Sequence, residues 1–327
     1  MLTGLKLSTS LVHVCNINLH MPKSILLIYN PASGYFLEKQ EDNPEAFFRE
    51  QLSEHRQTCQ LTFFKLESDP SSLLSEQLNE LQPDEIWVAG GDGTVLSVAQ
   101  SSVNTGIPIG IIPFGTMNLM ARDLGMSLDV KVAIKQLCHA SISKIDMAEL
   151  NGAPFLCISN IGMSTRLTEE RERLRHTSGW IRWPLMAGYM IRFMFAYPTQ
   201  SVHIKLGNQV HTLQTRSISI SNNLLEPNSS LIPQRKQLDK GCLGVYVAKH
   251  TSIWSLPRLI FRLLRKDWQS DKDILMFKAD HVRIQLSKPR RKVKIMTDGE
   301  LNEHSLPLDY HSKPSVLHIL RPLEETP

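Results

Sequence analysis

The chain contains 327 residues, and the 42% of them that are hydrophobic can build the core of one or two domains. Its 36 Lys and Arg residues barely outnumber its 32 Asp and Glu residues, so the net charge gives no reason to expect a nucleic-acid partner. No apolar run approaches the roughly 20 residues that a membrane span requires, which predicts a soluble or peripheral protein.

The five cysteines are widely scattered and include no Cys-x-x-Cys pair. This pattern favours free thiols in a reducing compartment over disulfides or a zinc site, so we expect a cytoplasmic protein. Residues 1–21 have neither a convincing signal-peptide apolar stretch nor an Ala-x-Ala-like cleavage site. We interpret them as an N-terminal extension ahead of the first predicted strand.

Predicted strands and helices alternate over residues 22–145. This alternation is typical of a parallel sheet covered by helices, with ligands bound outside the carboxyl ends of the strands. Short apolar runs predict the strands, and amphipathic patterns predict the helices. The strands are expected at residues 24–29, 61–66, 86–89 and 107–112, and the helices at residues 44–56, 71–81, 118–124 and 129–138.

Three of these strands end in loops rich in glycine, proline or threonine. Such loops let the backbone approach a ligand and present amide groups to an anion, and parallel strands would gather them at one edge. Glycine turns can also simply connect strands to helices without binding a ligand. This alternative is less favoured here, because two successive loops each end in Gly-Thr. The first loop is Asn30, Pro31, Ala32, Ser33 and Gly34, the second is Gly90, Gly91, Asp92, Gly93, Thr94, Val95 and Leu96, and the third contains Gly115, Thr116 and Asn118.

The second loop matches neither of two common nucleotide motifs. No Gly-Lys-Ser/Thr follows it, which excludes a Walker A motif, and Leu96 stands where a dinucleotide fingerprint needs its third glycine. We expect Thr94 to cap a helix that starts at Val95. A phosphate site at this loop would therefore be of another kind.

Strands replace the alternation after residue 145. A second, β-rich domain is predicted over residues 146–305, and residues 306–327 are expected to return toward the first domain with a strand at 315–320. Period-2 alternation is clear at residues 281–286. The other strands are expected at residues 155–159, 202–206, 211–221, 243–248 and 293–296.

Two segments of the second domain, residues 180–197 and 253–268, combine aromatic residues with arginine. Aromatic and arginine side chains suit the headgroup region of a bilayer, which predicts peripheral membrane contact. Amphipathic helices more often pack on their own domain, so this alternative stays open.

Four motifs resemble those of the diacylglycerol kinase catalytic-domain family, which also includes sphingosine kinases and bacterial lipid kinases. They are Asn-Pro-x-Ser-Gly at 30–34, Gly-Gly-Asp-Gly-Thr at 90–94, Gly-Thr-x-Asn at 115–118 and Thr-Asp-Gly-Glu at 297–300. The second motif alone is also shared with NAD kinases and the phosphofructokinase-like group. The resemblance implies a phosphofructokinase-like α/β nucleotide-binding domain with a parallel sheet, a β-rich sandwich-like lipid domain, and an active site between them.

The resemblance also implies that the protein uses ATP and Mg²⁺, and it implies which reaction they serve. The γ-phosphoryl group of ATP would be transferred to the hydroxyl of a diacylglycerol-like or related glycerolipid at a membrane surface. The three loops would bind the nucleotide, and Asp92 and Asp239 are candidates for the metal. Asp298 and Glu300 are candidates for the catalytic base, and the sequence does not decide between them.

Two departures from the family pattern keep other functions open. Leu119 replaces an aspartate that many members carry after the Gly-Thr-x-Asn asparagine. Asp239, Lys240 and Gly241 replace an Asp-Asp-Gly motif often tied to magnesium, and a lysine there opposes cation binding. The alternatives are NAD kinase-like nucleotide phosphorylation and a non-catalytic nucleotide- or lipid-binding protein. The sequence leaves open whether the protein forms a homodimer.

Overall fold

The computed structural model describes most of the chain outside its N-terminal segment. The predicted extension at residues 1–21 and the aromatic segment at residues 180–197, except residues 185 and 188, lie outside the described residues, as do Ala32 and Gly34. The described residues are 23–31, 33, 43–55, 59–66, 71–103, 105–162, 165, 185, 188, 199–227, 232, 234–249, 255–287 and 291–323.

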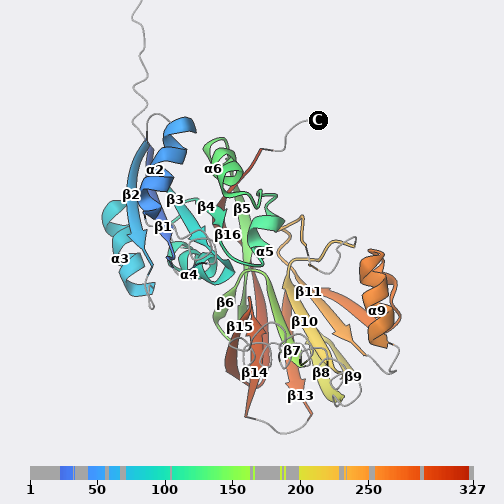
Figure 1. The fold of residues 1–327 in the computed structure, drawn as a ribbon. Helices are drawn as coiled ribbons and strands as arrows, with labels where there is room; N and C mark the ends of the chain where they lie inside the picture. Colours follow the sequence, from blue (N-terminus) through green and yellow to red (C-terminus); the bar gives the residue numbers. More distant parts are fainter. Residues whose placement is uncertain are drawn as a thin grey trace, which may run out of the picture.

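The N-terminal part has the predicted alternation of strands and helices (Figure 1). Its elements are β1 (Lys23–Tyr29), α2 (Pro44–His55), β2 (Cys59–Lys65), α3 (Ser71–Leu81), β3 (Glu85–Gly90), α4 (Asp92–Ser102), β4 (Ile109–Pro113), α5 (Leu119–Asp123) and α6 (Val130–Cys138). β1 pairs in parallel with β2 and β3, and β3 pairs in parallel with β4. Both β3 and β4 are buried along their whole length, as expected for parallel strands covered on both faces.

The C-terminal part is rich in strands. Its elements are β5 (Ser141–Leu150), β6 (Ala153–Phe155), β7 (Ile158–Gly162), β8 (Gln200–Leu206), β9 (Gln209–Thr215), β10 (Ser217–Asn222), β11 (Leu243–Ala248), α9 (Ser255–Leu264), η1 (Trp268–Ser270), β12 (Ile274–Ala279), β13 (His281–Leu286), β14 (Lys292–Thr297), β15 (Glu300–Ser305) and β16 (Leu308–Arg321). An antiparallel six-stranded sheet has the order β12-β11-β10-β7-β14-β15. Apolar side chains from this sheet and from β8, β13 and β16 pack into one core, which gives a sandwich.

The long strand β16 joins the two parts. Its first half pairs with β13, and near its end Ile319 pairs in parallel with Ile109 of β4. One mixed ten-stranded sheet results, with the order β2-β1-β3-β4-β16-β13-β8-β9 and with β5 and β6 attached beside β16. Its pairing with β5 shifts register between Lys313 and Leu317. The core also divides there: Tyr310 belongs to the sandwich core, whereas Leu317 and Ile319 belong to the core of the N-terminal part.

Several strand predictions need correction. The single strand predicted at residues 211–221 is two strands, β9 and β10, which lie in different sheets and are separated by Arg216. The strand predicted at residues 155–159 is interrupted at Leu156 and Cys157, whose amides donate to a side chain instead of a neighbouring strand. β5, β12 and β15 were not predicted as strands.

The start of helix α4 is also corrected. The helix begins at Asp92, with Gly91 as N-cap, and no side chain caps it. Thr94 therefore lies inside the first turn and does not cap a helix starting at Val95. Its side chain packs on Gly90, where an added Cβ would lie 2.5 Å from Thr94 Cβ, so residue 90 has room only for glycine.

Candidate active site

The three predicted loops lie next to one another at the carboxyl edge of the parallel sheet. The amide of Asn30 donates to Ala89 O at 3.2 Å, which joins the first loop to the end of β3. The amide of Phe114 donates to Gly90 O at 3.1 Å, which joins the second loop to the third. The strand order β1-β3-β4 thus brings together loops that lie far apart in the sequence, in the way that parallel strands predict.

The second and third loops meet backbone to backbone. A Cβ atom on Gly115 would lie 2.5 Å from Gly91 Cα, so only glycine fits at residue 115 without a backbone shift. Asn118 holds the third loop in this shape, because its Oδ1 accepts from Gly115 N–H at 2.8 Å and its Nδ2 donates to Gly115 O at 2.7 Å. Asn118 has φ 48°, a left-handed conformation that asparagine tolerates better than most residues.

The N-terminus of α4 presents its first amides at the second loop. An uncapped helix N-terminus carries free N–H groups and a partial positive charge, which together favour a phosphate. The amide of Val95 donates to Gly91 O at 3.0 Å and is used within the helix. The set of amides that could bind phosphate therefore narrows to those of Asp92, Gly93 and Thr94.

Ser33 in the first loop has an unsatisfied hydroxyl. Its side chain is buried, and Oγ has no hydrogen-bond partner in the described part of the chain. Leaving a buried polar atom unpaired costs about 1–3 kcal/mol. A phosphate or ribose oxygen would remove this cost, so Ser33 fits the nucleotide role predicted for it.

The two candidate metal ligands differ in their surroundings. Asp92 Oδ1 accepts from the amide of Met120 at 3.2 Å, which ties the start of α4 to α5. Asp239 is exposed, and its Oδ1 lies 3.3 Å from Lys240 Nζ, so the neighbouring ammonium group opposes a cation there. Asp92 therefore fits a place beside the nucleotide phosphates better than Asp239 does, and both metal assignments stay predictions.

The Thr-Asp-Gly-Glu motif forms the tip of a β-hairpin. Asp298 (φ 49°) and Gly299 (φ 91°) make the two-residue turn between β14 and β15, and Asp-Gly is a preferred sequence for a turn with two positive φ angles. Asp298 is buried, and its carboxylate accepts from the three successive amides of residues 156–158 at 2.6–2.9 Å. Burial raises the pKa of Asp298, while the three amide hydrogen bonds counteract this.

Glu300, two residues later, reaches the second loop. A Cβ atom on Gly93 would lie 3.1 Å from Glu300 Oε1, so the carboxylate of Glu300 sits beside the first turn of α4. Glu300 is exposed, in contrast to Asp298. The structure thus brings together the second and fourth motifs. It also distinguishes the two carboxylates, because that of Glu300 lies beside the second loop whereas that of Asp298 is bound to backbone amides.

A buried ion pair that the sequence did not predict connects the two parts of the chain. The Nε atom of Arg235 donates to Asp123 Oδ2 at 2.9 Å, and Nη1 donates to Leu156 O at 2.7 Å and to Asn222 O at 2.8 Å. Burial alone would lower the pKa of Arg235, but the carboxylate of Asp123 outweighs it and raises that pKa. Arg235 therefore connects α5 to residues 156–158, the segment whose amides donate to Asp298.

A separate cavity of about 450 Å³ opens beside β11 and β12. Met276 and Phe277 line it together with Lys240 and Lys278. Among the described residues, none from the four motifs lines this cavity, so it is distinct from the candidate active site.

Comparison with known proteins identifies both parts of the chain. Residues 24–150 match the family model described as the diacylglycerol kinase catalytic domain, and residues 158–321 match the model described as the YegS C-terminal NAD kinase beta sandwich-like domain. A diacylglycerol kinase of Bacillus subtilis (strain 168) is 23% identical over 93% of this chain and 98% of its own length. An uncharacterized protein of Synechocystis is 27% identical over 92% of this chain and 70% of its own length.

A solved structure shares the fold. The crystal structure of a diacylglycerol kinase from Bacillus anthracis str. Sterne aligns with a TM-score of 0.62 at 19% identity, over 91% of this chain and 97% of that one. The parallel N-terminal sheet and the sandwich-like C-terminal domain were both predicted, and the finer phosphofructokinase-like assignment stays a prediction. The chain belongs to the diacylglycerol kinase catalytic-domain family.

Proposed function

We propose that this protein transfers the γ-phosphoryl group of ATP to the hydroxyl group of a diacylglycerol-like glycerolipid. The observation that supports the proposal is the position of Glu300 Oε1, which would lie 3.1 Å from a Cβ atom on Gly93, so that an exposed carboxylate is close to amides suited to bind phosphate. Phosphoryl transfer needs both groups within reach of one reacting phosphorus atom.

Each group has a role in this reaction. The lipid hydroxyl oxygen forms a bond to the γ-phosphorus, the bond from that phosphorus to the β,γ-bridging oxygen breaks, and ADP leaves. Glu300 accepts the hydroxyl proton. The amides of Asp92, Gly93 and Thr94 and the hydroxyl of Ser33 bind the phosphates. Mg²⁺, when bound near Asp92, would neutralise the charge on the transferring group. Asp298 positions the hairpin that carries Glu300.

The test is phosphate transfer from γ-labelled ATP to a panel of diacylglycerol, related glycerolipids, sphingosine and NAD. Labelled phospholipid with unlabelled NAD is the expected result. NAD stays in the panel because the C-terminal family model is named for its NAD kinase-like sandwich. Labelled NADP without labelled lipid would replace the proposal with nucleotide phosphorylation, and no transfer to any acceptor would indicate a binding protein.

Replacing Gly93 by Ala is expected to lower kcat by about 10-fold or more while the protein stays folded. The added methyl group would sit 3.1 Å from Glu300 Oε1 and displace that carboxylate by a few tenths of an ångström, and small misplacements of catalytic groups reduce rates strongly. Initial rates at saturating substrates and circular dichroism are the measurements.

Gly115→Ala provides the contrast, because its methyl group would collide with the backbone of Gly91. This variant is expected to lose stability as well as activity. Wild-type kcat in a folded Gly93→Ala variant would contradict the placement of Glu300 beside the phosphates.

Peripheral membrane contact is proposed at helix α9. None of the helices in the described ranges has the length and hydrophobicity needed to cross a bilayer. Phe261 and Leu264 are 58% and 62% exposed on α9, and Arg265 lies over the Phe261 ring at 5.5 Å from its centroid. Exposed apolar side chains next to basic ones are typical of a surface that lies in the headgroup region.

Of the four basic residues near α9, two form ion pairs with carboxylates of the described residues. Arg258 pairs with Asp271 and Asp273, and Arg262 pairs with Asp267 at 3.1 Å. These pairs give two of the arginines a role within their own domain, in line with the alternative interpretation of residues 253–268. Arg265 and Lys266 are exposed and remain for anionic lipids.

The double variant Arg265→Gln/Lys266→Gln is expected to bind anionic vesicles about 30-fold more weakly, because each basic residue contributes about 1 kcal/mol at such a surface. Vesicle co-sedimentation with and without phosphatidylserine is the measurement. The matched control is Lys131→Gln/Lys135→Gln on α6, where both lysines are exposed. Equal binding by the two double variants would remove α9 from the membrane contact.

A further inference from the structure

A cluster of metal-ligating side chains lies on the sandwich domain, outside the candidate active site. His281 on β13 and Asp309 and His311 on β16 are partly exposed, with side-chain exposures of 40%, 25% and 45%. Val282 and Tyr310, which follow His281 and Asp309 in sequence, are fully buried in the sandwich core. Because side chains alternate along a strand, the three polar residues share the outer face of the ten-stranded sheet.

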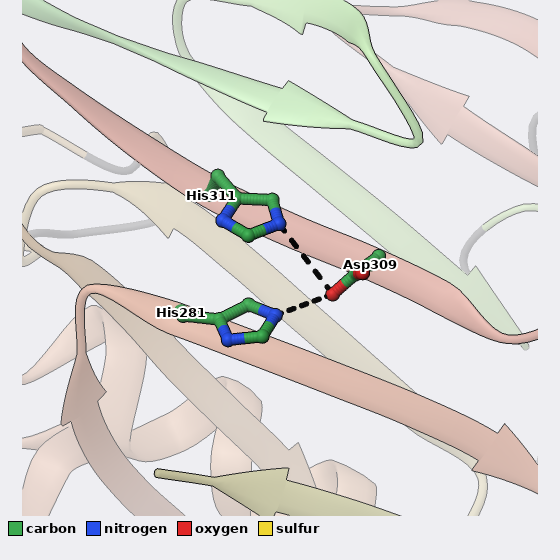
Figure 2. Close-up of side chains that lie close together, drawn as sticks. All are labelled: His281, Asp309 and His311. Atoms are coloured by element: carbon green, nitrogen blue, oxygen red, sulfur yellow. Dashed lines mark hydrogen bonds and ion pairs between the residues drawn. The ribbon is translucent and has the colours of Figure 1, made fainter.

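The strand register brings the three residues together. His281 and His311 are direct partners across the antiparallel pair, and Arg283 is the partner of Asp309. The two imidazole rings stack at 4.2 Å between centroids with an interplanar angle of 9°, and both turn toward the Asp309 carboxylate (Figure 2). His281 Nε2 lies 2.5 Å and His311 Nε2 lies 3.6 Å from Asp309 Oδ1.

These atoms are close enough to share one ion. The three potential ligand atoms all lie within 4.8 Å of one another. Ligands held at about 2.0–2.2 Å from a tetrahedral zinc ion lie roughly 3.3 Å apart. Small rotations of the side chains would reach this arrangement without movement of the strands, which are fixed on both sides by β8 and β5.

The donor set points to the kind of ion. Two imidazole nitrogens and one carboxylate oxygen are typical ligands of Zn²⁺ and similar divalent transition metals, whereas Mg²⁺ prefers oxygen ligands alone. Arg283 Nη2 donates to Asp309 Oδ2 at 2.7 Å, which orients the carboxylate and leaves Oδ1 facing both imidazoles. Such an outer partner commonly supports a metal ligand.

We propose that His281, Asp309 and His311 form a binding site for a Zn²⁺-like divalent ion with a fourth position open to water. The site joins β13 to β16 on the face opposite the sandwich core. It is independent of the proposed kinase reaction, and an ion there would stabilise the folded chain by mass action because the unfolded chain does not hold the three residues together.

The test uses the full chain after treatment with a chelator and buffer exchange, without nucleotide. Zn²⁺ is titrated by calorimetry, and Co²⁺ is titrated by visible absorption, which reports the coordination geometry. One equivalent of saturable binding is expected. Each of the variants His281→Gln and His311→Gln is expected to weaken that binding 10-fold or more, and thermal unfolding with and without Zn²⁺ is expected to show clear stabilisation of the wild type and much less of either variant.

His203→Gln is the matched control, because His203 is partly exposed on the neighbouring strand β8 and its ring nitrogens already lie 2.9 Å from Thr212 Oγ1 and 3.1 Å from Ser287 Oγ. This variant is expected to bind Zn²⁺ as the wild type does. Circular dichroism without metal checks that every variant is folded. If the wild type shows no saturable binding, or if His281→Gln and His311→Gln bind as tightly as the control, the cluster is an ordinary surface ion pair and the proposal is overturned.

Discussion

Replacing Glu300 by Gln is expected to lower kcat by about 10²- to 10⁴-fold, the range that a general base contributes. Glutamine keeps the size of the side chain but cannot accept the hydroxyl proton. Glu300 is exposed at the start of β15, so the change should hardly affect the free energy of unfolding. Initial rates with saturating ATP and lipid, combined with denaturant unfolding, measure both quantities.

Asp298→Asn is the comparison that separates the two carboxylates. Its amide group can accept from some but not all of the three backbone amides that bind Asp298, and each buried amide left unpaired costs about 1–3 kcal/mol. This variant is therefore expected to lose stability first. A stable but inactive Asp298→Asn protein, together with an active Glu300→Gln protein, would reverse the two roles.

Replacing Arg235 by Ala is expected to lower the free energy of unfolding by about 3–5 kcal/mol, because it leaves the carboxylate of Asp123 buried without its partner. The change also removes the donors to Leu156 O and Asn222 O. Urea unfolding followed by circular dichroism measures the loss. Arg321→Ala is the matched control, since the bond from Arg321 Nη2 to Lys236 O is long, at 3.3 Å, and exposed, so the change should cost less than about 1 kcal/mol.

The double variant Asp123→Leu/Arg235→Met tests the reason for the loss. Apolar side chains of similar volume remove both charges at once, so this protein should be more stable than Arg235→Ala alone. If the single variant unfolds at the wild-type urea concentration, the pair does not hold the two parts together.

The sequence predicted the elements whose signal is local. The loops containing Gly91 and Gly115 could be recognised because glycine and short apolar runs are contiguous, and the parallel strand order then placed them together. β15 could not be predicted, since its sequence from Glu300 to Ser305 is largely polar and gains its strand conformation from pairing with β14. Arg235 lies in a polar loop with no periodic pattern, and its burial depends on residues more than 70 positions away.

The candidate catalytic carboxylates show the same limit. Asp298 and Glu300 are two residues apart, and nothing in their spacing says which one meets a loop 200 residues earlier. The turn at Asp298 decides this, because its positive φ directs the carboxylate toward the amides of Leu156, Cys157 and Ile158. For α9, the basic residues were visible in the sequence, but the pairing of Arg258 with Asp271 and Asp273 required the tertiary structure.

The position of β16 has a consequence for how the chain is made. β4 has a partner on only one side until residue 319 has been synthesised, because Ile109 pairs with Ile319 across 210 positions. The N-terminal part thus exposes an apolar edge on the ribosome, and exposed edges attract other strands. We expect a nascent chain stopped before residue 308 to need chaperones. After synthesis is complete, we expect both hydrophobic cores to finish packing slowly, because both include side chains of β16.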